Sequence, residues 1–416
     1  MILEHPKYDI ILAGAGLSGL SLAFELARRP GFRQKKILLL DRDRKQKNDR
    51  TWCFWATEDD HLPPVLFRSW EYCRFYAPDF EKNMRIAPFR YHMVRGIDFY
   101  NWVFGELDQC PNVTRISTTI SGIDAHQGLV FTDAGSFSAD LIFNSAFTHT
   151  PIMPRPTPVY PQSPFSDDRL MGRKKIRGEM EYGPLVRLLQ HFKGWVVKTN
   201  PGTFDPAAMT FMDFRIPQHG ETRFVYVLPF SDSEALVEFT VFSPTLLPLE
   251  AYDTALRNYL SDFMGLTTYT VQEEEFGVIP MTNFPFPSGQ EGRVINIGTA
   301  GGFVKASSGY AFKRTLQKIE RFVDAWEKSG LPDPSRLVSP WSFRAFDSIF
   351  LQVLQSHNEL GSEIFTCLFK KLPPALVLRF LDEQSTFAEN LRLVSAPPAG
   401  PFLRAFVQQM PMLFRL

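Results

Sequence analysis

The feature that most constrains this chain is a glycine-rich turn directly after its first strand. The segment reads YDIILAGAGLSGLSLAFELARR, a short apolar strand over Tyr8–Ala13, a tight turn and the start of a helix. In the G-x-G-x-x-G spacing the first glycine permits the turn, the second lets the backbone approach a pyrophosphate, and the third lets helix and strand pack closely. The N–H groups at the helix start favour that anion. The pattern predicts a dinucleotide site made by Gly14, Ala15, Gly16, Leu17 and Gly19.

A second strand supports this prediction. The segment KKILLLDRD follows the helix and ends at Asp41, the position whose carboxylate accepts hydrogen bonds from the adenosine ribose 2′-OH. An acid there would repel the 2′-phosphate of NADP, so the site is expected to take FAD or NAD. A glycine turn without a ligand is the structural alternative, and the three parts in this order argue against it.

A second glycine-rich turn lies far along the chain, in RVINIGTAGGFVKASSGYAF. Its strand, 293–297, leads into Gly298, Thr299, Gly301 and Gly302. Two such turns, one near each end of the chain, suit the long FAD molecule better than NAD, because one can hold the pyrophosphate while the other contacts the flavin. FAD enzymes of this build usually have an acid where this chain has Thr299, so atypical flavin chemistry is expected.

The middle of the chain contains three strand-like segments. They are MTFMDFRI (209–216), TRFVYVLPF (222–230) and ALVEFTVFS (235–243), joined by the turn-forming links PQHGE and SDSE. Apolar and aromatic runs separated by short polar links predict an antiparallel meander.

A single carboxylate, Glu238, lies on the last of these apolar strands. In such surroundings a carboxyl group either finds a partner or keeps its proton through a raised pKa. Counting from the turns places Asp213 opposite Tyr226 and Tyr226 opposite Glu238, with the two acids roughly 10 Å apart. An ion pair with Arg215 is an equally weighted alternative for Asp213, and a structural role is preferred for Tyr226. Glu238 has no basic residue within its strand, which favours a functional role.

Composition narrows the class of protein. At 416 residues the chain is expected to form one large two-part fold or two closely packed domains. Lys and Arg number 45 and so do Asp and Glu, which gives no indication of nucleic-acid binding. The four cysteines have no metal-site spacing and are expected to be reduced thiols, and no apolar run approaches the ~20 residues of a membrane span. The chain begins directly with the first strand, so no signal peptide is expected.

Taken together, the motifs resemble the flavin-dependent lycopene cyclases of the bacterial β-cyclase type. The resemblance rests, in chain order, on DIILAGAGLSGLSLAFEL, NDRTWCFW, FMDFR, RFVYVLPFSDSEALVEFTVFSP and IGTAGGFVKASSGYAF, and extends to FDSIFLQVL and FTCLFKKLPP. It implies that the glutamate of the VEFT motif, here Glu238, is tied to catalysis. Cyclases commonly lack the acid that is missing at Thr299. Phe239 stands where many members have a second acid, which puts any mechanism with two adjacent carboxylates in doubt.

The resemblance implies a redox-neutral, acid-catalysed cyclisation of the linear ψ-end groups of lycopene to β-ionone rings. It also implies FAD in its reduced form, with NADPH as the electron source and no net redox turnover. The alternative is a flavin-dependent reductase or monooxygenase acting on an isoprenoid, and a third hypothesis is a carotenoid carrier. Whether Glu238 or the flavin donates the proton stays open, as do the number of ends cyclised, the β- or ε-ring preference and the oligomeric state.

Protonation of an alkene creates a carbocation, which aromatic faces stabilise by roughly 0.5–2 kcal/mol each. The expected catalytic acids are Glu238 and Asp213. The expected pocket residues are Trp52, Trp55, Phe211, Tyr226 and Phe242, although core packing explains each of them as well.

The expected fold class is α/β, an FAD-binding Rossmann-like domain with an inserted antiparallel-sheet substrate domain and a helical C-terminal part. The expected ranges are 1–75 and 76–150 for the FAD-binding domain and its continuation, 151–285 for the substrate sheet, 286–330 for the second glycine turn, and 331–416 for the helices. Basic amphipathic segments in the last range either pack on the protein or lie in a membrane interface. Because lycopene dissolves in bilayers, peripheral membrane association on the cytoplasmic side is expected.

Overall fold

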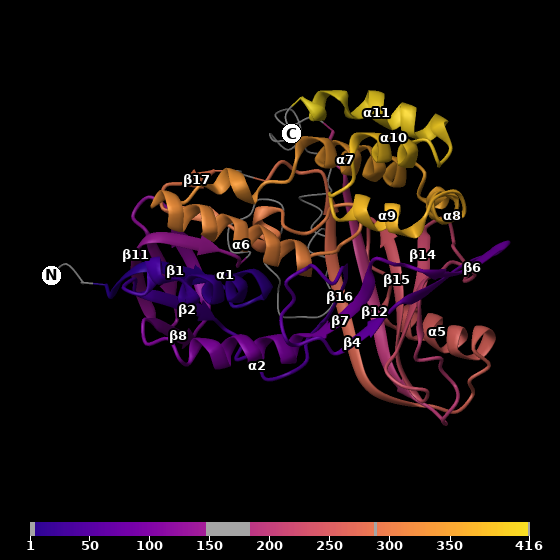
Figure 1. The fold of residues 1–416 in the computed structure, drawn as a ribbon, viewed down its shortest axis with the longest axis horizontal. Coiled ribbons are helices and arrows are strands. Elements are labelled where there is room, and N and C mark those ends of the chain that lie inside the picture. The colour runs from indigo at the N-terminus through magenta and orange to yellow at the C-terminus, as the bar shows by residue number, and fades with distance from the viewer. Residues whose placement is uncertain (1–4, 147–183, 287–288, 415–416) are drawn as a thin grey trace.

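The computed structural model describes residues 5–146, 184–286 and 289–414. Figure 1 shows two lobes side by side, with a layer of C-terminal helices along the top of the second lobe. The first lobe holds the N-terminal strands, in indigo and magenta, together with helix α6. The second lobe is a tall sheet that is built mainly from the middle of the chain.

The first lobe is built on a sheet whose strands run in the order β17-β18-β11-β1-β2-β8. β1 (Lys7–Ala13) pairs in parallel with β2 (Ile37–Asp41) on one side and β11 (Gly135–Asn144) on the other. Strands covered on both faces are apolar throughout, which explains the run of buried residues in β1 and β2. The other strands are β8 (Val113–Ser117), β17 (Gln290–Glu291) and β18 (Val294–Asn296).

Helices cover one face of this sheet and a hairpin covers the other. One apolar cluster joins the sheet to three helices, α1 (Leu17–Arg28), α2 (Gly96–Leu107) and α6 (Phe312–Ser329). The opposite cluster includes residues of β10 (Leu129–Thr132), which pairs with β9 (Ile120–Asp124). The sheet is therefore fully sandwiched, as a Rossmann-like core requires.

The second lobe is a seven-stranded sheet in the order β16-β12-β15-β14-β13-β5-β6. The predicted meander is present, since neighbouring strands β13, β14 and β15 pair antiparallel in chain order. The strand bounds are Tyr72–Ala77 (β5), Phe80–Arg85 (β6), Arg187–Lys198 (β12), Ala208–Asp213 (β13), Thr222–Pro229 (β14), Glu234–Ser243 (β15) and Thr270–Thr282 (β16).

Two strands of the second sheet lie outside the residue range that the sequence analysis assigned to the substrate domain. The range 76–150 was assigned to the cofactor domain, but β5 and β6 extend the second sheet, because β5 pairs in parallel with β13. The expected boundary at residue 75 falls inside β5. The beginning of the expected substrate range, 151–183, lies outside the described residues.

The two faces of β15 enter different apolar clusters. Leu236 and Phe242 pack into the cluster shared with the C-terminal helices, whereas Val237 and Val241 pack toward α5 (Leu249–Asn258). Alternation along the strand places Glu238 on the side of Leu236, as predicted.

The C-terminal part is helical, as the sequence predicts. Its helices are α7 (Trp341–Ser356), α8 (Gly361–Lys371), α9 (Pro374–Leu381), α10 (Phe387–Val394) and α11 (Ala399–Leu413). A small sheet, β3 (Thr51–Ala56), β7 (Arg90–Arg95) and β4 (Arg68–Trp70), adds its buried aromatic residues to the two main clusters. None of the helices in the described ranges has both the length and the apolar character needed to cross a bilayer.

Candidate active site

An open cavity of about 880 Å³ lies where β1, β2 and β18 end, between the two glycine turns. Both turns therefore reach one cavity, which is the arrangement that the sequence predicts for a long dinucleotide. The predicted cofactor residues that line it are Gly14, Gly16, Leu17, Asp41, Gly298 and Thr299.

The three glycine positions of the first turn favour glycine for different structural reasons. Gly14 has φ +110°, a conformation that side chains rarely adopt, and a Cβ there would lie 2.4 Å from the Ser145 Oγ. A Cβ at Gly19 would lie 1.8 Å from the carbonyl oxygen of Gly14. A Cβ at Gly16 would meet nothing within 4 Å, which leaves that side of the turn open to a ligand.

Asp41 is fixed at the edge of this cavity. Its Oδ2 accepts a hydrogen bond of 2.6 Å from the backbone N–H of Ala15, and its Oδ1 accepts one of 2.8 Å from that of Asp43. The carboxylate thus stands at the end of β2, where a ribose hydroxyl can donate to it. Ala15 itself contributes through its backbone rather than by lining the cavity.

The second turn places its residues on two sides. Gly298 has φ +65° and begins a short 3₁₀ helix, Gly298–Gly301, beside the main cavity. Gly301 and Gly302 instead line a separate cavity behind the turn. Three buried polar atoms lie in or beside the segment that follows: the hydroxyls of Ser307 and Ser308 and the Oε1 of Gln190, none of which has a hydrogen-bond partner among the residues that the structure describes. Such atoms suit the polar edge of a bound ring system.

Glu238 lines an adjoining pocket of about 100 Å³. This pocket shares Thr51, Trp52 and Phe192 with the larger cavity, so the two are neighbours. The Oε1 of Glu238 accepts a hydrogen bond of 2.9 Å from the Thr240 hydroxyl. Burial, followed by the nearby charge of Glu275, raises the pKa of Glu238 well above its usual value. The chemical consequence is that the protonated form of this carboxyl group is favoured.

Three tyrosines line the pocket around this acid. Tyr226 lies directly opposite Glu238 in the pairing of β14 with β15, as predicted. Its hydroxyl is 3.5 Å from that of Tyr310, which is 3.2 Å from that of Tyr91. Burial raises the pKa of each of the three hydroxyls, so all remain neutral. The predicted Trp52 also lines this pocket.

Asp213 does not join this row. A β-bulge between Thr210 and Asp213 shifts the register, so Asp213 lies opposite Val225 rather than Tyr226. Its carboxylate is fully buried, is paired with Arg215 and accepts a hydrogen bond of 2.9 Å from the Tyr259 hydroxyl. Tyr259 belongs to the cluster on the opposite face of the sheet. The predicted polar row therefore contains Tyr226 and Glu238 but not Asp213.

The remaining predicted pocket residues form a layer behind the tyrosines. Trp55 packs edge-on against Tyr310 at 4.6 Å between ring centroids, and Phe211 packs edge-on against Tyr226 at 6.0 Å. Phe242 contacts Phe224 at 5.5 Å, farther along β15 from Glu238. These three residues support the pocket wall rather than lining it.

A second carboxyl group, Glu275 of β16, was not identified from the sequence. It hydrogen-bonds with Glu238, lines the larger cavity, and accepts a hydrogen bond of 2.8 Å from the Thr51 hydroxyl. Burial raises its pKa too, while the bonds from Thr51 and Glu238 act in the opposite direction. The sequence signal that could have identified Glu275 is the segment QEEEFG. Successive side chains of a strand point to opposite faces, so Glu274 lies on the outer face beside Lys193 and Glu275 on the inner face.

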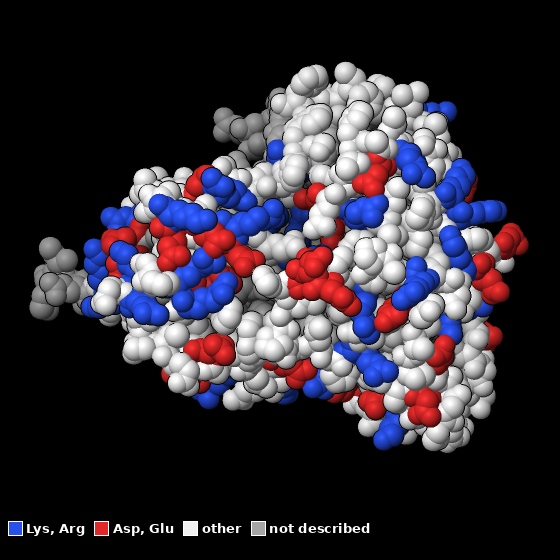
Figure 2. Space-filling model, viewed as in Figure 1, with Lys and Arg blue, Asp and Glu red and all other residues white. Residues whose placement is uncertain are grey.

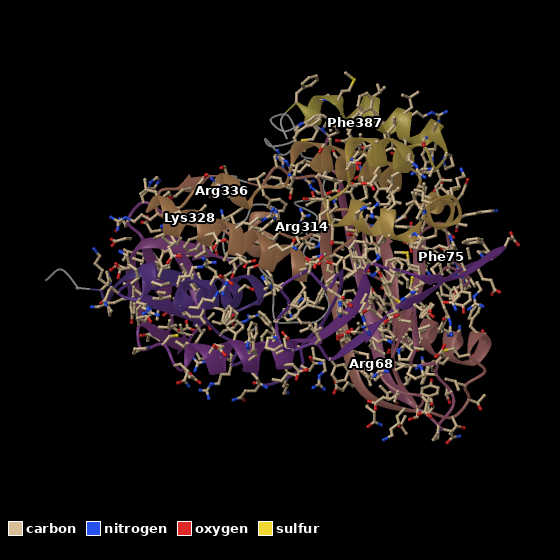
Figure 3. All side chains as sticks on the ribbon, in the orientation of Figure 1. Arg68, Phe75, Arg314, Lys328, Arg336 and Phe387 are labelled. Carbon is tan, nitrogen blue, oxygen red and sulfur yellow. The ribbon has the colours of Figure 1, made fainter. Side chains whose placement is uncertain are left out.

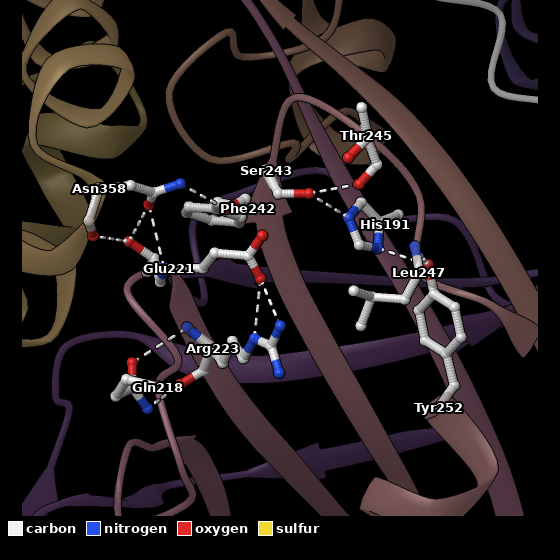
Figure 4. Close-up of polar contacts among 11 residues, drawn as sticks. His191, Gln218, Glu221, Arg223, Phe242, Ser243, Thr245, Leu247, Tyr252 and Asn358 are labelled. Carbon is white, nitrogen blue, oxygen red and sulfur yellow. Dashed lines mark hydrogen bonds and ion pairs between the residues drawn. The ribbon is translucent and has the colours of Figure 1, made fainter. Parts of the chain in front are cut away.

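A separate buried polar network lies on the other side of the sheet (Figure 4). The His191 Nε2 is 2.8 Å from the Ser243 hydroxyl, which donates to the Thr245 carbonyl, so Nε2 carries the proton. Its Nδ1 accepts from the Tyr252 hydroxyl at 2.6 Å. Every donor has an acceptor, which favours the neutral imidazole, and burial lowers the pKa of His191 to about 4. This network has a structural role.

A family model and related proteins match the chain over nearly its full length. Residues 9–407 match the family model described as lycopene cyclase protein. A lycopene beta-cyclase of Pantoea ananas is 23% identical over 422 residues, covering 96% of this chain and 97% of that protein.

Two solved structures share the fold. A geranylgeranyl bacteriochlorophyll reductase-like protein from Thermoplasma acidophilum has a TM-score of 0.58 at 11% identity, covering 97% of this chain and all of the other. Flavin-dependent brominase Bmp2 has a TM-score of 0.52 at 11% identity, covering 97% and 98%. They confirm the predicted α/β fold class.

Proposed function

The chain belongs to the lycopene cyclase family, and from this premise we propose that it is a lycopene β-cyclase. It converts the linear ψ-end groups of lycopene to β-ionone rings, giving γ-carotene and then β-carotene, without net oxidation or reduction. The observation that best supports this proposal is Glu238, an acid whose pKa is raised by burial in a pocket walled by tyrosines and Trp52. Protonation of a carbon–carbon double bond requires such an acid.

The reaction balances without a co-reactant. Glu238 gives its proton to a terminal alkene carbon, whose π electrons form the new C–H bond and leave a tertiary cation. The next double bond attacks this cation and closes the ring. A ring proton then leaves, and its C–H electrons form the ring double bond. The Glu238 carboxylate, which formed when the side chain gave up its proton, is protonated again. The product has the mass of the substrate.

The pocket walls protect the cation. The aromatic faces of Trp52 and Tyr226 stabilise positive charge by roughly 0.5–2 kcal/mol each. The hydroxyls of Tyr91, Tyr226 and Tyr310 contact one another, which leaves them few hydrogen bonds to offer a water molecule that would trap the cation as an alcohol.

FAD fits the larger cavity. Gly14, Gly16 and the start of α1 are placed to hold its pyrophosphate, Asp41 its ribose, and Gly298 with Thr299 the opposite end. Reduced FAD supplies, when bound, an electron-rich ring system that stabilises positive charge beside the pocket. We assign NADPH as the source of the electrons that reduce it.

The C-terminal helices provide a surface for membrane contact. Figure 2 shows few charged residues over α10 and α11, and Phe387, which is labelled in Figure 3, begins α10 and is 83% exposed. The exposed large apolar residues of this surface are Trp341, Phe387, Leu391, Val394, Leu403, Phe406, Val407, Met410 and Phe414. Exposed apolar residues on these helices, together with a bilayer-soluble substrate, favour peripheral membrane attachment, on the cytoplasmic side.

The test is an anaerobic assay. Purified protein is mixed with FAD, dithionite and lycopene in liposomes, and the mass and absorption of the product are followed over time. The expected product has unchanged mass and a shortened conjugated system, formed without stoichiometric loss of reduced flavin. A mass change of two hydrogens, or conversion only after oxygen is admitted, would replace this proposal with a flavin-dependent oxidoreductase acting on an isoprenoid. Unchanged lycopene that copurifies with the protein would indicate a carrier.

A further inference from the structure

Glu238 and Glu275 belong to strands that are not neighbours. β12 lies between β15 and β16, and on it one residue, Gly194, is paired with Glu238 on one side and with Glu275 on the other. Two strand spacings, about 9–10 Å, separate the backbones of the two acids. Their side chains nevertheless hydrogen-bond with each other.

Gly194 makes this contact possible. Its backbone φ does not require glycine, so the reason for glycine is space. A Cβ at this position would lie 3.1 Å from the Glu275 Cγ, 3.3 Å from its Oε1 and 2.9 Å from the Leu236 Cδ1. Any side chain there would stand between the carboxyl groups, and the absence of one leaves a gap across which they meet.

We propose that Glu275 is the positioning residue of the proton donor, and that Glu238 and Glu275 form one carboxyl pair across the gap at Gly194. This inference rests on the proposed cyclase function. Glu275 holds and orients the proton that Glu238 gives to the alkene carbon. When the ring proton leaves, the pair takes it up, so the pair ends each turnover in the protonation state in which it began.

The hydrogen bonds give the two acids different tasks. Glu275 accepts from the Thr51 hydroxyl and from Glu238, and both bonds lower its pKa against the larger effect of burial, whereas the same contact raises the pKa of Glu238. Of the two acids, Glu275 is therefore the one that ionises first. Glu238 then carries the proton, beside the tyrosine-walled pocket. Two carboxyl groups in one buried site cannot both ionise readily, which raises the pKa of the group that carries this proton.

The groups that face the pair do not disturb this assignment. The side chains around Glu238 are neutral donors or thiols, whereas opposite charges, one of each sign, approach Glu275. The facing groups are Cys53, Tyr91, Tyr226, Tyr310, Thr51 and Thr240, with Arg50 and Glu273 on the side of Glu275. The second acid that many family members have next to the VEFT glutamate is Phe239 here, and Glu275 supplies a carboxyl group from another strand.

The test is the pH dependence of kcat for the holoenzyme on lycopene liposomes under anaerobic, reducing conditions. Glu275→Gln removes the neighbouring charge, so Glu238 loses its proton at lower pH. The alkaline limb of the profile is expected to move down by at least one pH unit, while flavin content stays that of the wild type. Glu274→Gln, the adjacent outward-facing acid, is the matched control and leaves the limb in place. The flavin's own titration is common to all variants.

Two further measurements distinguish the loss of the carboxyl pair from a folding defect in Glu275→Gln. Gly194→Ala keeps both acids and inserts one methyl group between them, and it is expected to move the limb in the same direction by a smaller amount. Infrared spectra of the resting protein report the carbonyl band of a protonated carboxyl group. That band is expected to disappear in Glu238→Gln and to titrate at lower pH in Glu275→Gln.

The outcomes separate this inference from the proposed function. An alkaline limb and an infrared titration that do not move in Glu275→Gln, together with an inactive Glu238→Gln, would overturn the carboxyl pair and leave the cyclase intact. A product other than a cyclised isomer of lycopene would instead overturn the function.

Discussion

Arg215 holds Asp213 on the face of the sheet turned away from Glu238. The Arg215 Nε donates to Asp213 Oδ1 at 2.9 Å, and Nη2 lies 2.5 Å from Oδ2. Asp213→Asn removes the charge of a fully buried carboxylate from its half-buried partner Arg215 and weakens the hydrogen bonds between them, so the free energy of unfolding is expected to fall by about 2 kcal/mol. Activity per folded molecule is expected to remain. Urea unfolding and specific activity, corrected for the folded fraction, check both.

Asp205→Asn is the control for this change, because Asp205 makes an exposed ion pair with Arg74 on the same sheet and surface pairs contribute little. A stable but inactive Asp213→Asn protein would assign Asp213 a catalytic role after all.

Glu238→Gln removes the acidic proton but keeps the size of the side chain. We expect the fold and flavin content of the wild type and a loss of activity of roughly 10²- to 10⁴-fold, the usual contribution of a general acid. Product formation is followed by chromatography, and flavin by absorbance. Glu234→Gln, at the start of the same strand, is the control. Wild-type cyclisation by Glu238→Gln would move the acid role to another group.

Asp41→Asn removes the carboxylate expected to bind the ribose. We expect the fraction of protein that retains FAD after gel filtration to fall, with addition of excess FAD restoring part of the activity. Asp43→Asn changes an exposed acid two residues later and serves as the comparison. Equal flavin content in Asp41→Asn and the wild type would show that Asp41 does not bind the cofactor.

The lowered pKa of His191 leads us to expect that the folded protein loses stability in mild acid. Its pKa in the folded protein is about 4, below the value of about 6.5 expected when unfolded, so the unfolded chain binds the extra proton first. Stability is therefore full above pH 6.5 and falls as the pH drops toward 4, by about 2 kcal/mol at pH 5. Urea unfolding at pH 7 and pH 5 measures this difference.

His191→Gln is expected to be less stable at pH 7 but to lose less on going to pH 5. His92, whose pKa is also lowered to about 4, titrates in both proteins and cancels in the comparison. The same pH effect in the variant and the wild type would mean that His191 is not the responsible group.

The exposed apolar residues of α11 are expected to be required for binding of the protein to membranes. Leu403 and Val407 are 66% and 59% exposed and lie one helical turn apart. Leu403→Glu with Val407→Glu is expected to move the protein from the floating to the soluble fraction in vesicle flotation. Phe131→Glu, an exposed apolar position on the first lobe, is the control. Unchanged flotation of the double variant would exclude α11 as the contact surface.

Much of the site could be predicted because its signals are local. The first glycine turn, the end of β2 at Asp41 and the faces of β15 follow from spacing and alternation within single segments. The pairing of Tyr226 with Glu238 followed because the link between β14 and β15 is short, and a short turn fixes the register.

The remainder depends on contacts that no local pattern specifies. The bulge before Asp213 changes which face that side chain occupies, and a bulge leaves no clear mark in alternation. Glu275 meets Glu238 only because β12 comes between their strands, and the order of strands in a sheet is a tertiary property. Phe242 shares a face with Glu238 but is too far along the strand to reach the pocket.

The order of the strands has a consequence for synthesis of the chain. The first sheet is completed by β17 and β18, which are made after every strand of the second sheet, while β5 and β6 of the second sheet are made before β11 of the first. The first sheet therefore cannot be completed on the ribosome until the whole second sheet has been made, and β5 and β6 must wait for the later strands of the second sheet while the first is still incomplete. Cutting the gene between the lobes would therefore yield two incomplete sheets with exposed edges, whereas coexpression of both fragments would give each edge its missing partner.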